Sequence, residues 1–450
     1  MLALEPHPLG GETENIRLFV QFSLIQSAVF NPKTSRKDMQ PTDDLALAAV
    51  PAIHGGRPLF AERFRFCQPL LPTLVSAMQY YVAAYTDGTI TNASAVEHLE
   101  AAVAERLQVK HCVAVSSCTS GLMLVLRALG VTGEVIVPSF TFFATGHAVL
   151  WNGLRPVFAD CDEETWNVDP VDVEGKITED TSAILVVHLY GNPCRVEELE
   201  RLASRKQLKL IFDAAHGFGS HYRNRPLGGF GDAEVFSLSP TKLLVAGEGG
   251  LVTTNDGTLA RAIRAMRNYG DLGAYDPEWL GRSARMPEFN AALALAGLPL
   301  VEAKVARRNW IAEKYTNLLA SLPGLRFQKV LPSNVSTYKD YSIHVSSDAF
   351  GMTRDALAEA LLAEKIETKK YFFPPLHKQR LYSSFHSTKR GGLARTSYVA
   401  GGIVSLPIYE SLPDATVEQV AYAIQRLARF NSSEMRALAN ERCRHVAART

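Results

Sequence analysis

Short apolar runs alternate with segments of helical spacing between residues 112 and 253, and this alternation constrains the fold more than any other feature of the sequence. The runs are continuously apolar, as strands are when both faces of their sheet are covered. Helical patterns stand between several of them, at 121–129 and 196–205 for example, as crossover helices do. The sequence therefore predicts an α/β fold with a large, mostly parallel, seven-stranded sheet. Parallel strands are expected at 112–115, 134–137, 156–159, 183–188, 209–212, 233–236 and 250–253.

Further segments precede and follow the predicted sheet in the sequence. Residues 1–56 mix Pro, Gly and charge with short apolar pieces, so we expect an N-terminal extension, followed by the large domain over 57–300. A long charged helical pattern opens a smaller C-terminal α+β domain over 301–430, and 431–450 form a basic tail. In the smaller domain we expect helices at 301–322, 354–364 and 416–429, a strand at 341–345 and a loop at 371–377.

Composition excludes several classes of protein. With 47% hydrophobic and 21% charged residues among 450, the chain has the composition of a folded domain. Its formal net charge of +1 provides no field for nucleic acid or an anionic membrane, so neither is expected as a partner. The six cysteines lie far apart without metal-ligand spacing, which predicts reduced thiols and no metal site. The early apolar stretch at 18–30 is too short and polar for a membrane span or a secretory signal, so we expect a cytoplasmic protein.

Polar residues that follow strands are the candidates for chemistry, because ligands bind at the carboxyl ends of strands in open α/β sheets. Small hydroxylated residues, 116–121, end the first strand and open a helix, whose free N–H groups could hold a phosphate. The alternative is that Thr119 or Ser120 only caps that helix. An acid, Asp213, follows another strand and would need a positive partner such as a protonated ring nitrogen, or else caps the next helix.

Two further places complete the set. Lys242 lies among small and apolar residues that favour a neutral amine, the form that attacks a carbonyl, although a lone lysine is more often a surface charge. The glycines at 247–250 after it are also consistent with a simple turn. Of the rings Phe140, Phe142 and Phe143, one could stack on a planar cofactor, and at least two are expected in the core. A phosphate cradle, a ring, an acid and a lysine are what pyridoxal phosphate requires.

No glycine fingerprint for dinucleotides, phosphate-binding loop for nucleotides, or hydrolase or zinc-protease motif is present. On its motifs, the stretch from about 59 to 427 resembles the DegT/DnrJ/EryC1/StrS family, sugar aminotransferases of the fold-type-I pyridoxal-phosphate-dependent transferases. The similar motifs are Asp213-Ala214-Ala215-His216, Phe236-Ser237-Leu238-Ser239-Pro240-Thr241-Lys242, Gly247-Glu248-Gly249-Gly250, Thr91-Asn92, Pro138-Ser139-Phe140-Thr141-Phe142, Asn268-Tyr269-Gly270, Arg285-Met286-Pro287-Glu288-Phe289 and Tyr371-Phe372-Phe373-Pro374-Pro375-Leu376-His377.

The resemblance implies a role for each matching residue. Lys242 would carry the cofactor and move the proton, and Asp213 would pair with the ring nitrogen. His216 would lie beside the ring's 3′-oxygen, and Phe142 would stack on the ring. The phosphate would be bound by the backbone at Cys118 and Thr119 and by the hydroxyl of Ser237.

The family also implies a homodimer with active sites at the interface, where a neighbouring chain offers an Asn to the phosphate. Here Ser283 replaces that Asn, so we expect Arg282 as a substitute phosphate partner. Two further differences from the family pattern are Ser239, in place of His or Asn, and Cys118, in place of Gly.

The activity implied by the resemblance is transfer of an amino group from an amino acid, glutamate, to a nucleotide-linked keto-deoxysugar. The segment 371–377 resembles subgroups that act at C4, which indicates dTDP-4-keto-6-deoxyhexose as the substrate. Candidate substrate contacts are Arg282, Arg285, Tyr371 and His377. The candidates for the diphosphate are Arg282, Arg285, Lys369 and Lys370, although each alone is more often a solvated surface charge. The alternatives are an aminotransferase for a cyclitol or another small ketone, a sugar dehydratase, whose branch carries His at the position of Lys242, and a non-enzymatic regulatory module.

Overall fold

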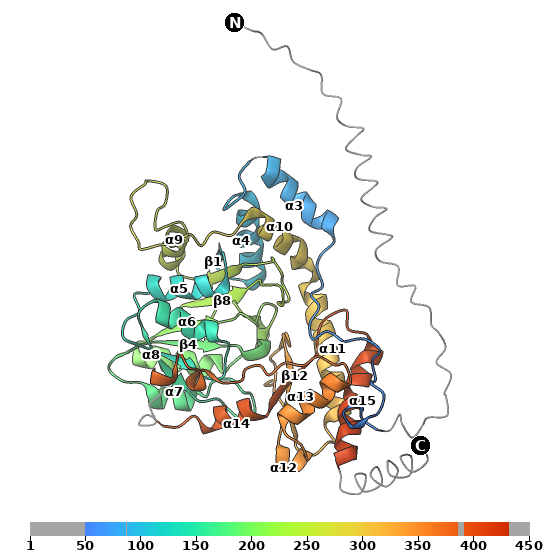
Figure 1. The fold of residues 1–450 in the computed structure, drawn as a ribbon. Helices are drawn as coiled ribbons and strands as arrows, with labels where there is room; N and C mark the ends of the chain where they lie inside the picture. Colours follow the sequence, from blue (N-terminus) through green and yellow to red (C-terminus); the bar gives the residue numbers. More distant parts are fainter. Residues whose placement is uncertain (1–49, 87, 386–390, 432–450) are drawn as a thin grey trace, which may run out of the picture. The chain divides into compact units, whose positions relative to one another are not determined.

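The computed structural model describes residues 50–86, 88–385 and 391–431, and its centre is a seven-stranded sheet in the order β1-β9-β8-β5-β4-β2-β3 (Figure 1). All seven predicted strands are confirmed, each within two residues of its expected ends. They are β1 (His111–Val115), β2 (Glu134–Pro138), β3 (Arg155–Ala159), β4 (Thr181–Val187), β5 (Lys209–Asp213), β8 (Ala233–Ser237) and β9 (Gly250–Thr254).

The sheet is mostly parallel, as expected, with one exception. β2, β3, β4, β5 and β8 run parallel to their neighbours within this group, whereas β9 is antiparallel to both β1 and β8. The prediction of a parallel strand at 250–253 is therefore wrong. Its physical reason is the connection from β8, residues 238–249, which contains no helix to carry the chain back across the sheet before β9 begins.

Helices cover both faces of the sheet (Figure 1). In β5 the side chains alternate between them, with Leu210 and Phe212 in one core cluster and Ile211 in the other. Full burial of each such side chain contributes about 1.5–3 kcal/mol, which explains why these strands are continuously apolar. One face is covered by α4 (Ser94–Leu107), α7 (Pro170–Lys176), α8 (Val196–Lys206) and α10 (Glu288–Gly297), and the other by α5 (Cys118–Ala128), α6 (Phe143–Trp151) and α9 (Gly257–Met266).

A second lobe follows with its own core and a three-stranded antiparallel sheet. The helix expected at 301–322 ends earlier, at Leu319, and the one expected at 416–429 extends by two residues at each end. The elements are β10 (Leu325–Phe327), β11 (Tyr341–Val345) and β12 (Ile403–Leu406), with α11 (Val301–Leu319), α12 (Ser347–Phe350), α13 (Arg354–Ala363), α14 (Ala394–Gly402) and α15 (Asp414–Asn431).

The first described residues pack on this second lobe. The buried carboxylate of Glu364 accepts hydrogen bonds from the N–H groups of Ala52, at 2.8 Å, and Leu59, at 3.0 Å. Phe64 forms a β-bridge with Ile366. The predicted domain boundaries stay a prediction, and we propose that residues 57–66 be assigned with 301–430. Residues 1–49 of the expected extension, and 432–450 of the expected basic tail with Cys443, lie outside the described residues.

The helical run Glu288–Leu319 is the one stretch of the described residues long and apolar enough to cross a membrane, and half of its apolar window is buried inside the fold. It carries Lys304, whose ammonium donates to the carbonyl oxygens of Leu70 (2.7 Å) and Leu243 (2.8 Å). A helix in the core of a folded domain passes the same test of length and composition.

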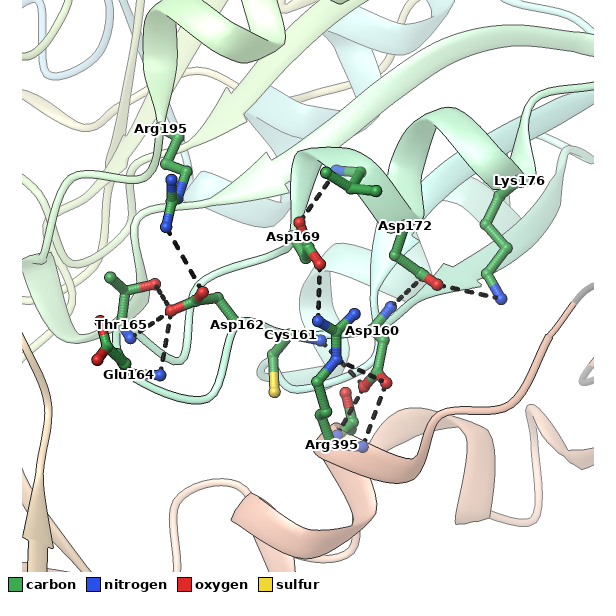
Figure 2. Close-up of polar contacts among 12 residues, drawn as sticks. Asp160, Cys161, Asp162, Glu164, Thr165, Asp169, Asp172, Lys176, Arg195 and Arg395 are labelled. Atoms are coloured by element: carbon green, nitrogen blue, oxygen red, sulfur yellow. Dashed lines mark hydrogen bonds and ion pairs between the residues drawn. The ribbon is translucent and has the colours of Figure 1, made fainter.

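An acidic junction joins the end of β3 to α14 (Figure 2). The carboxylate of Asp160, 4% exposed, accepts hydrogen bonds from the N–H groups of Thr396 (2.6 Å) and Arg395 (3.2 Å). The Arg395 guanidinium also pairs with Asp169 at 2.7 Å. Asp160 thus caps the first turn of α14 from another part of the chain.

Candidate active site

The candidate residues gather at the carboxyl ends of β5 and β8 and at the first turn of α5. Asp213 ends β5 and Ser237 ends β8, and these strands are neighbours in the sheet. Helix α5 begins at Cys118, three residues before the expected start, and its cap is Ser117, whose Oγ accepts the Ser120 N–H at 3.1 Å. The idea that Thr119 or Ser120 caps this helix is therefore wrong. The N–H groups of Cys118 and Thr119 have no carbonyl of their own helix to bond, so they can hold a phosphate.

The glycine run at 247–250 has a packing reason. A Cβ on Gly250 would lie 2.6 Å from the backbone nitrogen of Cys118, closer than any side chain tolerates. Gly250 pairs in the sheet with both Val115 and Ser237, so it brings the start of β9 directly against the turn into α5. The segment is more than a simple turn, because the shape of the phosphate-binding turn depends on it.

The carboxylate of Asp213 is buried and held by three donors. Thr145 Oγ1 donates to Oδ2 at 2.7 Å, while Oδ1 accepts the Ala215 N–H at 3.1 Å and the Cys118 thiol at 3.8 Å. Burial raises the pKa of Asp213, and the bonds from Thr145 and Ala215 and the charge of Lys242 oppose that rise. No side chain of the described residues forms an ion pair with it. Such a carboxylate is prepared for a cation that a ligand brings.

Lys242 lies in the connection between β8 and β9, where its N–H bonds to the Ser239 carbonyl at 3.0 Å. Its side chain is half-buried. Desolvation lowers the pKa of Lys242 to about 8, helped by the charge of Lys339 and opposed by Asp340, Cys118 and Asp213. About a tenth of the amine is therefore neutral at pH 7, far more than for an ordinary lysine.

His216 is held as a neutral imidazole. Its Nδ1 accepts the N–H of Tyr190 at 3.1 Å, which places the ring proton on Nε2. Burial, with the charges of Lys242 and Lys339, holds the pKa of His216 well below its usual range. The ring lies parallel to that of Phe372, with centroids 6.1 Å apart and an interplanar angle of 5°. His216 can therefore donate a hydrogen bond from Nε2 at any pH near neutrality.

The aromatic cluster after β2 differs from expectation. Only Phe140 is in the core, whereas Phe142 and Phe143 are each 43% exposed, so the expectation that at least two of the rings are buried is wrong. Phe142 precedes α6, and its carbonyl accepts the N–H of Thr145, the residue that holds Asp213. An exposed ring is thus tied to the buried carboxylate through the first turn of one helix.

The candidates in the loop 371–377 take different places. The half-buried ring of Tyr371 stacks on Phe372 at 5.2 Å and so joins the cluster around His216. His377 is buried, with Nδ1 2.6 Å from the Ser139 hydroxyl and Nε2 3.3 Å from that of Ser397. Because hydroxyls contact both ring nitrogens, His377 anchors this loop, and its role as a substrate contact stays a prediction.

The remaining candidates are not brought to Lys242 by contacts within the described residues. The loop between α9 and α10 extends away from the sheet (Figure 1). Arg282 and Ser283 are exposed where this loop returns, since the N–H of Arg282 bonds to the carbonyl of Met266 and Ser283 forms a β-bridge with Asn268. Arg282 Nη1 lies 3.3 Å from the sulfur of Met123, and Arg285 donates to Asn268 at 2.7 Å. Lys369 and Lys370 pair with carboxylates of the second lobe, Glu367 (at 3.9 Å) and Asp355.

Three residues of this region were not predicted from the sequence: Thr145, Lys339 and Asp340. Thr145 is fully buried in α6, and the Lys339–Asp340 pair lies immediately before β11. A threonine in a short helix and two adjacent opposite charges are common in any sequence, so no local signal marks them.

The site fits pyridoxal phosphate. It offers the amine of Lys242, whose pKa is lowered to about 8. Within electrostatic reach of this amine lies the buried carboxylate of Asp213, which has no ion-pair partner among the described residues. The start of α5 and the Ser237 hydroxyl provide phosphate donors, and Phe142 provides an exposed ring. These are the groups that the aldehyde, the ring nitrogen, the phosphate and the face of this cofactor need.

Comparisons with known proteins agree with this fit. The profile of the DegT/DnrJ/EryC1/StrS aminotransferase family matches residues 75–425. The dTDP-4-amino-4,6-dideoxy-D-glucose transaminase of Escherichia coli is 34% identical over 357 residues, 78% of this chain and 95% of that protein. GDP-perosamine synthase of Escherichia coli O157:H7 is 33% identical over 370 residues, 81% and 98% of the two chains. The crystal structure of DesI in the presence of its TDP-sugar product superposes with a TM-score of 0.78 at 33% identity, covering 89% of this chain and 99% of that one. The chain therefore belongs to the DegT/DnrJ/EryC1/StrS family and is a pyridoxal-phosphate-dependent aminotransferase with the expected α/β fold.

Proposed function

We propose that the enzyme transfers an amino group from glutamate to the keto group of a nucleotide-linked 6-deoxysugar, dTDP-4-keto-6-deoxyhexose. One observation carries this proposal: Lys242, a lysine of lowered pKa, and Asp213, a buried carboxylate without an ion-pair partner among the described residues, lie within electrostatic reach of each other. The sugar class is supported by two relatives, a dTDP-4-amino-sugar transaminase and an enzyme crystallised with its TDP-sugar product. In the whole reaction, the amino acid gives its amino group to the keto-sugar in exchange for the keto oxygen, and the products are a 2-oxo acid and an amino sugar.

The chain's own residues have distinct tasks in this reaction. When bound, the cofactor supplies an electron-accepting ring that stabilises negative charge at the carbon bearing the amino group. The bonds from Thr145 and Ala215 oppose the rise in the pKa of Asp213 that burial causes, so its carboxylate would favour a proton on the ring nitrogen. The Nζ of Lys242 takes a proton from the α-carbon of the donor and delivers one to the acceptor carbon.

The other assigned residues bind and orient. The N–H groups of Cys118 and Thr119 and the hydroxyl of Ser237 hold the phosphate, because they are uncharged donors at a helix start. Phe142 covers one face of the ring, and Nε2 of His216 donates to its 3′-oxygen. Tyr371 lines the substrate side, where it packs on Phe372.

A homodimer completes this proposal. Apolar side chains are exposed on α3 (Leu74–Thr86) and on α10, which pack together through Tyr81 and Phe289, whose ring centroids are 3.7 Å apart. Adjoining exposed apolar side chains are typical of protein interfaces. In a dimer, the exposed loop that carries Arg282, Ser283 and Arg285 would reach the phosphate and the nucleotide in the neighbouring site. The exposed apolar side chains of this face are Leu74, Val75, Val82, Tyr85 and Phe289. Cytoplasmic location remains a prediction from the sequence.

The test has two parts. Borohydride reduction of the purified yellow protein should fix the cofactor on the peptide that contains Lys242, and a label on any other lysine would refute the assignment. The amine form of the enzyme is then mixed with dTDP-, UDP- and GDP-linked keto-sugars and with a cyclitol ketone. We expect the dTDP-4-keto-6-deoxyhexose to restore the aldehyde form fastest, whereas a preference for the cyclitol would replace the sugar assignment. Lys242→Ala is the control and should be inactive with every ketone.

A further inference from the structure

A buried ion pair next to the active site has no task in the chemistry above. Lys339 Nζ lies 2.8 Å from Oδ1 of Asp340, and their side chains are only 7% and 2% exposed. Both residues stand immediately before β11, the middle strand of the second lobe's sheet. Taking two charges out of water costs several kcal/mol per ion, so such a pair needs a structural or functional reason.

Contacts tie this pair to the cofactor side of the site. The N–H of Lys339 donates to the carbonyl of Tyr190 at 2.8 Å, and the N–H of Tyr190 donates to Nδ1 of His216. The ammonium of Lys339 lies 5.3 Å from the ring centroid of Tyr371, which stacks on Phe372. A single residue, Tyr190, therefore links the backbone of Lys339 to the ring of His216. The ammonium of Lys339 also lies next to Tyr371, a predicted substrate contact. The charge of Lys339 also lowers the pKa of both Lys242 and His216, which agrees with this proximity.

The backbone around the pair is fixed, but the pair itself is incompletely satisfied. The guanidinium of Arg308 donates to the carbonyl of Lys339 at 2.9 Å, and Arg308 in turn pairs with Glu410. By contrast, Oδ2 of Asp340 is buried without a hydrogen-bond partner among the described residues. An ammonium can donate three hydrogen bonds, and Asp340 is the one side-chain acceptor recorded for Lys339 in the described part of the chain. The pair thus has unused bonding capacity on both partners.

The reaction asks one site to accept two ligands of different charge. An amino-acid donor brings a carboxylate to the reacting centre, whereas the keto carbon of a sugar lies among uncharged groups. A buried cation without a counter-ion would carry a large desolvation cost whenever the sugar is bound. A cation that is permanently paired with a carboxylate of the protein could not bind the carboxylate of the donor. A lysine with a neighbouring carboxylate that it can leave and rejoin meets both requirements, because its four-carbon stem is flexible.

We propose that Lys339 binds a carboxylate of the amino-acid donor, and that Asp340 is the counter-ion to which the ammonium returns when the keto-sugar occupies the site. The inference rests on the proposed function, since it names the residue that recognises the donor. It assigns Lys339 to the donor half of the reaction and leaves the sugar half to other residues.

The test separates the two half-reactions in Lys339→Met, which keeps the length of the side chain and removes its charge. Conversion of the yellow enzyme by glutamate should need about 10- to 100-fold more glutamate, the loss expected for one charge-assisted hydrogen bond. Calorimetric titration with glutarate, a dicarboxylate that cannot react, should show a similar loss of affinity. Conversion of the amine form should need the same concentration of keto-sugar as in the wild type. This concentration is compared rather than the rate, because loss of the Lys339 charge also raises the pKa of Lys242. Lys329→Met, which breaks the exposed pair with Glu164, is the matched control and should change neither half-reaction.

A second variant covers the case in which Lys339→Met leaves Asp340 unpaired and fails to fold. In Lys339→Met/Asp340→Leu both charges are removed, and the same selective loss of glutamate and glutarate binding is expected. An equal rise in the glutamate and keto-sugar concentrations that conversion needs, or unchanged glutarate affinity in a folded variant, would overturn the inference. A wild-type enzyme that is converted by glutamate but by no keto-sugar would refute the proposed acceptor, while the glutarate titrations would still decide the role of Lys339.

Discussion

The carboxylate of Asp213 depends on neighbours that are distant in the sequence. Thr145, 68 residues earlier, donates the shortest of its hydrogen bonds, and the thiol of Cys118 approaches from a third segment. A buried carboxylate without such donors would take up a proton and lose its hold on a ring nitrogen. The pKa of this one residue is thus set by several segments together.

Thr145→Val tests this dependence, because valine keeps the shape of threonine and lacks the hydroxyl. Removing a bond that lowers the pKa of Asp213 raises that pKa, so the carboxylate is protonated at a higher pH and binds the cofactor less well. We expect the Kd for pyridoxal phosphate to rise about 10- to 100-fold, with the largest loss at low pH. Titration of the apoprotein followed by absorbance measures it. Thr141→Val is the matched control, because that hydroxyl contacts Thr145 at 3.2 Å and not the carboxylate; equal effects of the two variants would disprove the argument.

The pKa of Lys242, about 8, predicts how cofactor capture by the apoprotein depends on pH. The pKa is lowered, so the amine is protonated and unreactive below pH 8 and neutral above it. The rate of capture should rise with pH up to about 8 and then level off, whereas an ordinary lysine would keep gaining reactivity to about 10.4. Stopped-flow absorbance between pH 6 and 10 measures the rate. A continued rise up to pH 10 would show that Lys242 is not desolvated as described.

Site residues at the ends of strands could be predicted from the sequence. Residues that come close to the site only through the packing of distant segments could not. Asp213, Ser237 and Lys242 follow apolar strands in motifs typical of a known family, so their type and place both indicate a site. Asp213 and Ser237 end neighbouring strands, and Asp213 and Lys242 influence each other's pKa, while the roles of all three residues stay proposals. Thr145 and Lys339 reach the site only because α6 and β11 pack there, and His377 matched a motif although its nitrogens face Ser139 and Ser397.

At the level of elements, α14 is fastened by Asp160 more than by its own sequence. The N-cap position of α14 is Leu393, which has no capping side chain, and the carboxylate of Asp160 takes over that function (Figure 2). Ser397 in the same helix contacts His377, so the capped helix also supports the loop next to the site.

Asp160→Asn should therefore destabilise the protein by about 1.5–3 kcal/mol, because an amide cannot replace a charged acceptor for both backbone N–H groups and Arg395. Urea unfolding followed by circular dichroism measures the change. In Glu174→Gln, which removes an exposed pair with Arg205, the change should stay below about 1 kcal/mol. Equal midpoints for Asp160→Asn and the wild type would show that α14 does not need the cap.

The existence of elements was predictable, and the direction of β9 was not. Buried strands are apolar on both faces, so each could be found in the sequence, but the same residues can form a strand in either direction. What decides the direction is the connection, and the sequence of 238–249 does not exclude a crossover helix by composition.

For the whole molecule, the proposed dimer makes a prediction about assembly. Val82 is 51% exposed on α3, in the apolar face shared with α10, and Val82→Asp would place a charge in the proposed interface. We expect the wild type to be a dimer and this variant to be a monomer, measured by light scattering after size exclusion. Val171→Asp, at a position 76% exposed on α7, should remain dimeric. A monomeric wild type, or a dimeric Val82→Asp protein, would contradict the assignment of this face.

The reversed strand β9 has a consequence for how sites of this kind can change during evolution. Because β9 enters the sheet from the ligand side, its opening glycine is wedged between the ends of two other strands, Val115 and Ser237. Inserting or deleting one residue before Gly250 would exchange the inward and outward faces of the strand and put a side chain where no space exists. The amino-acid sequence of the connection 238–249, which carries Lys242, can thus change, but its length must stay constant for β9 to keep its register in the sheet.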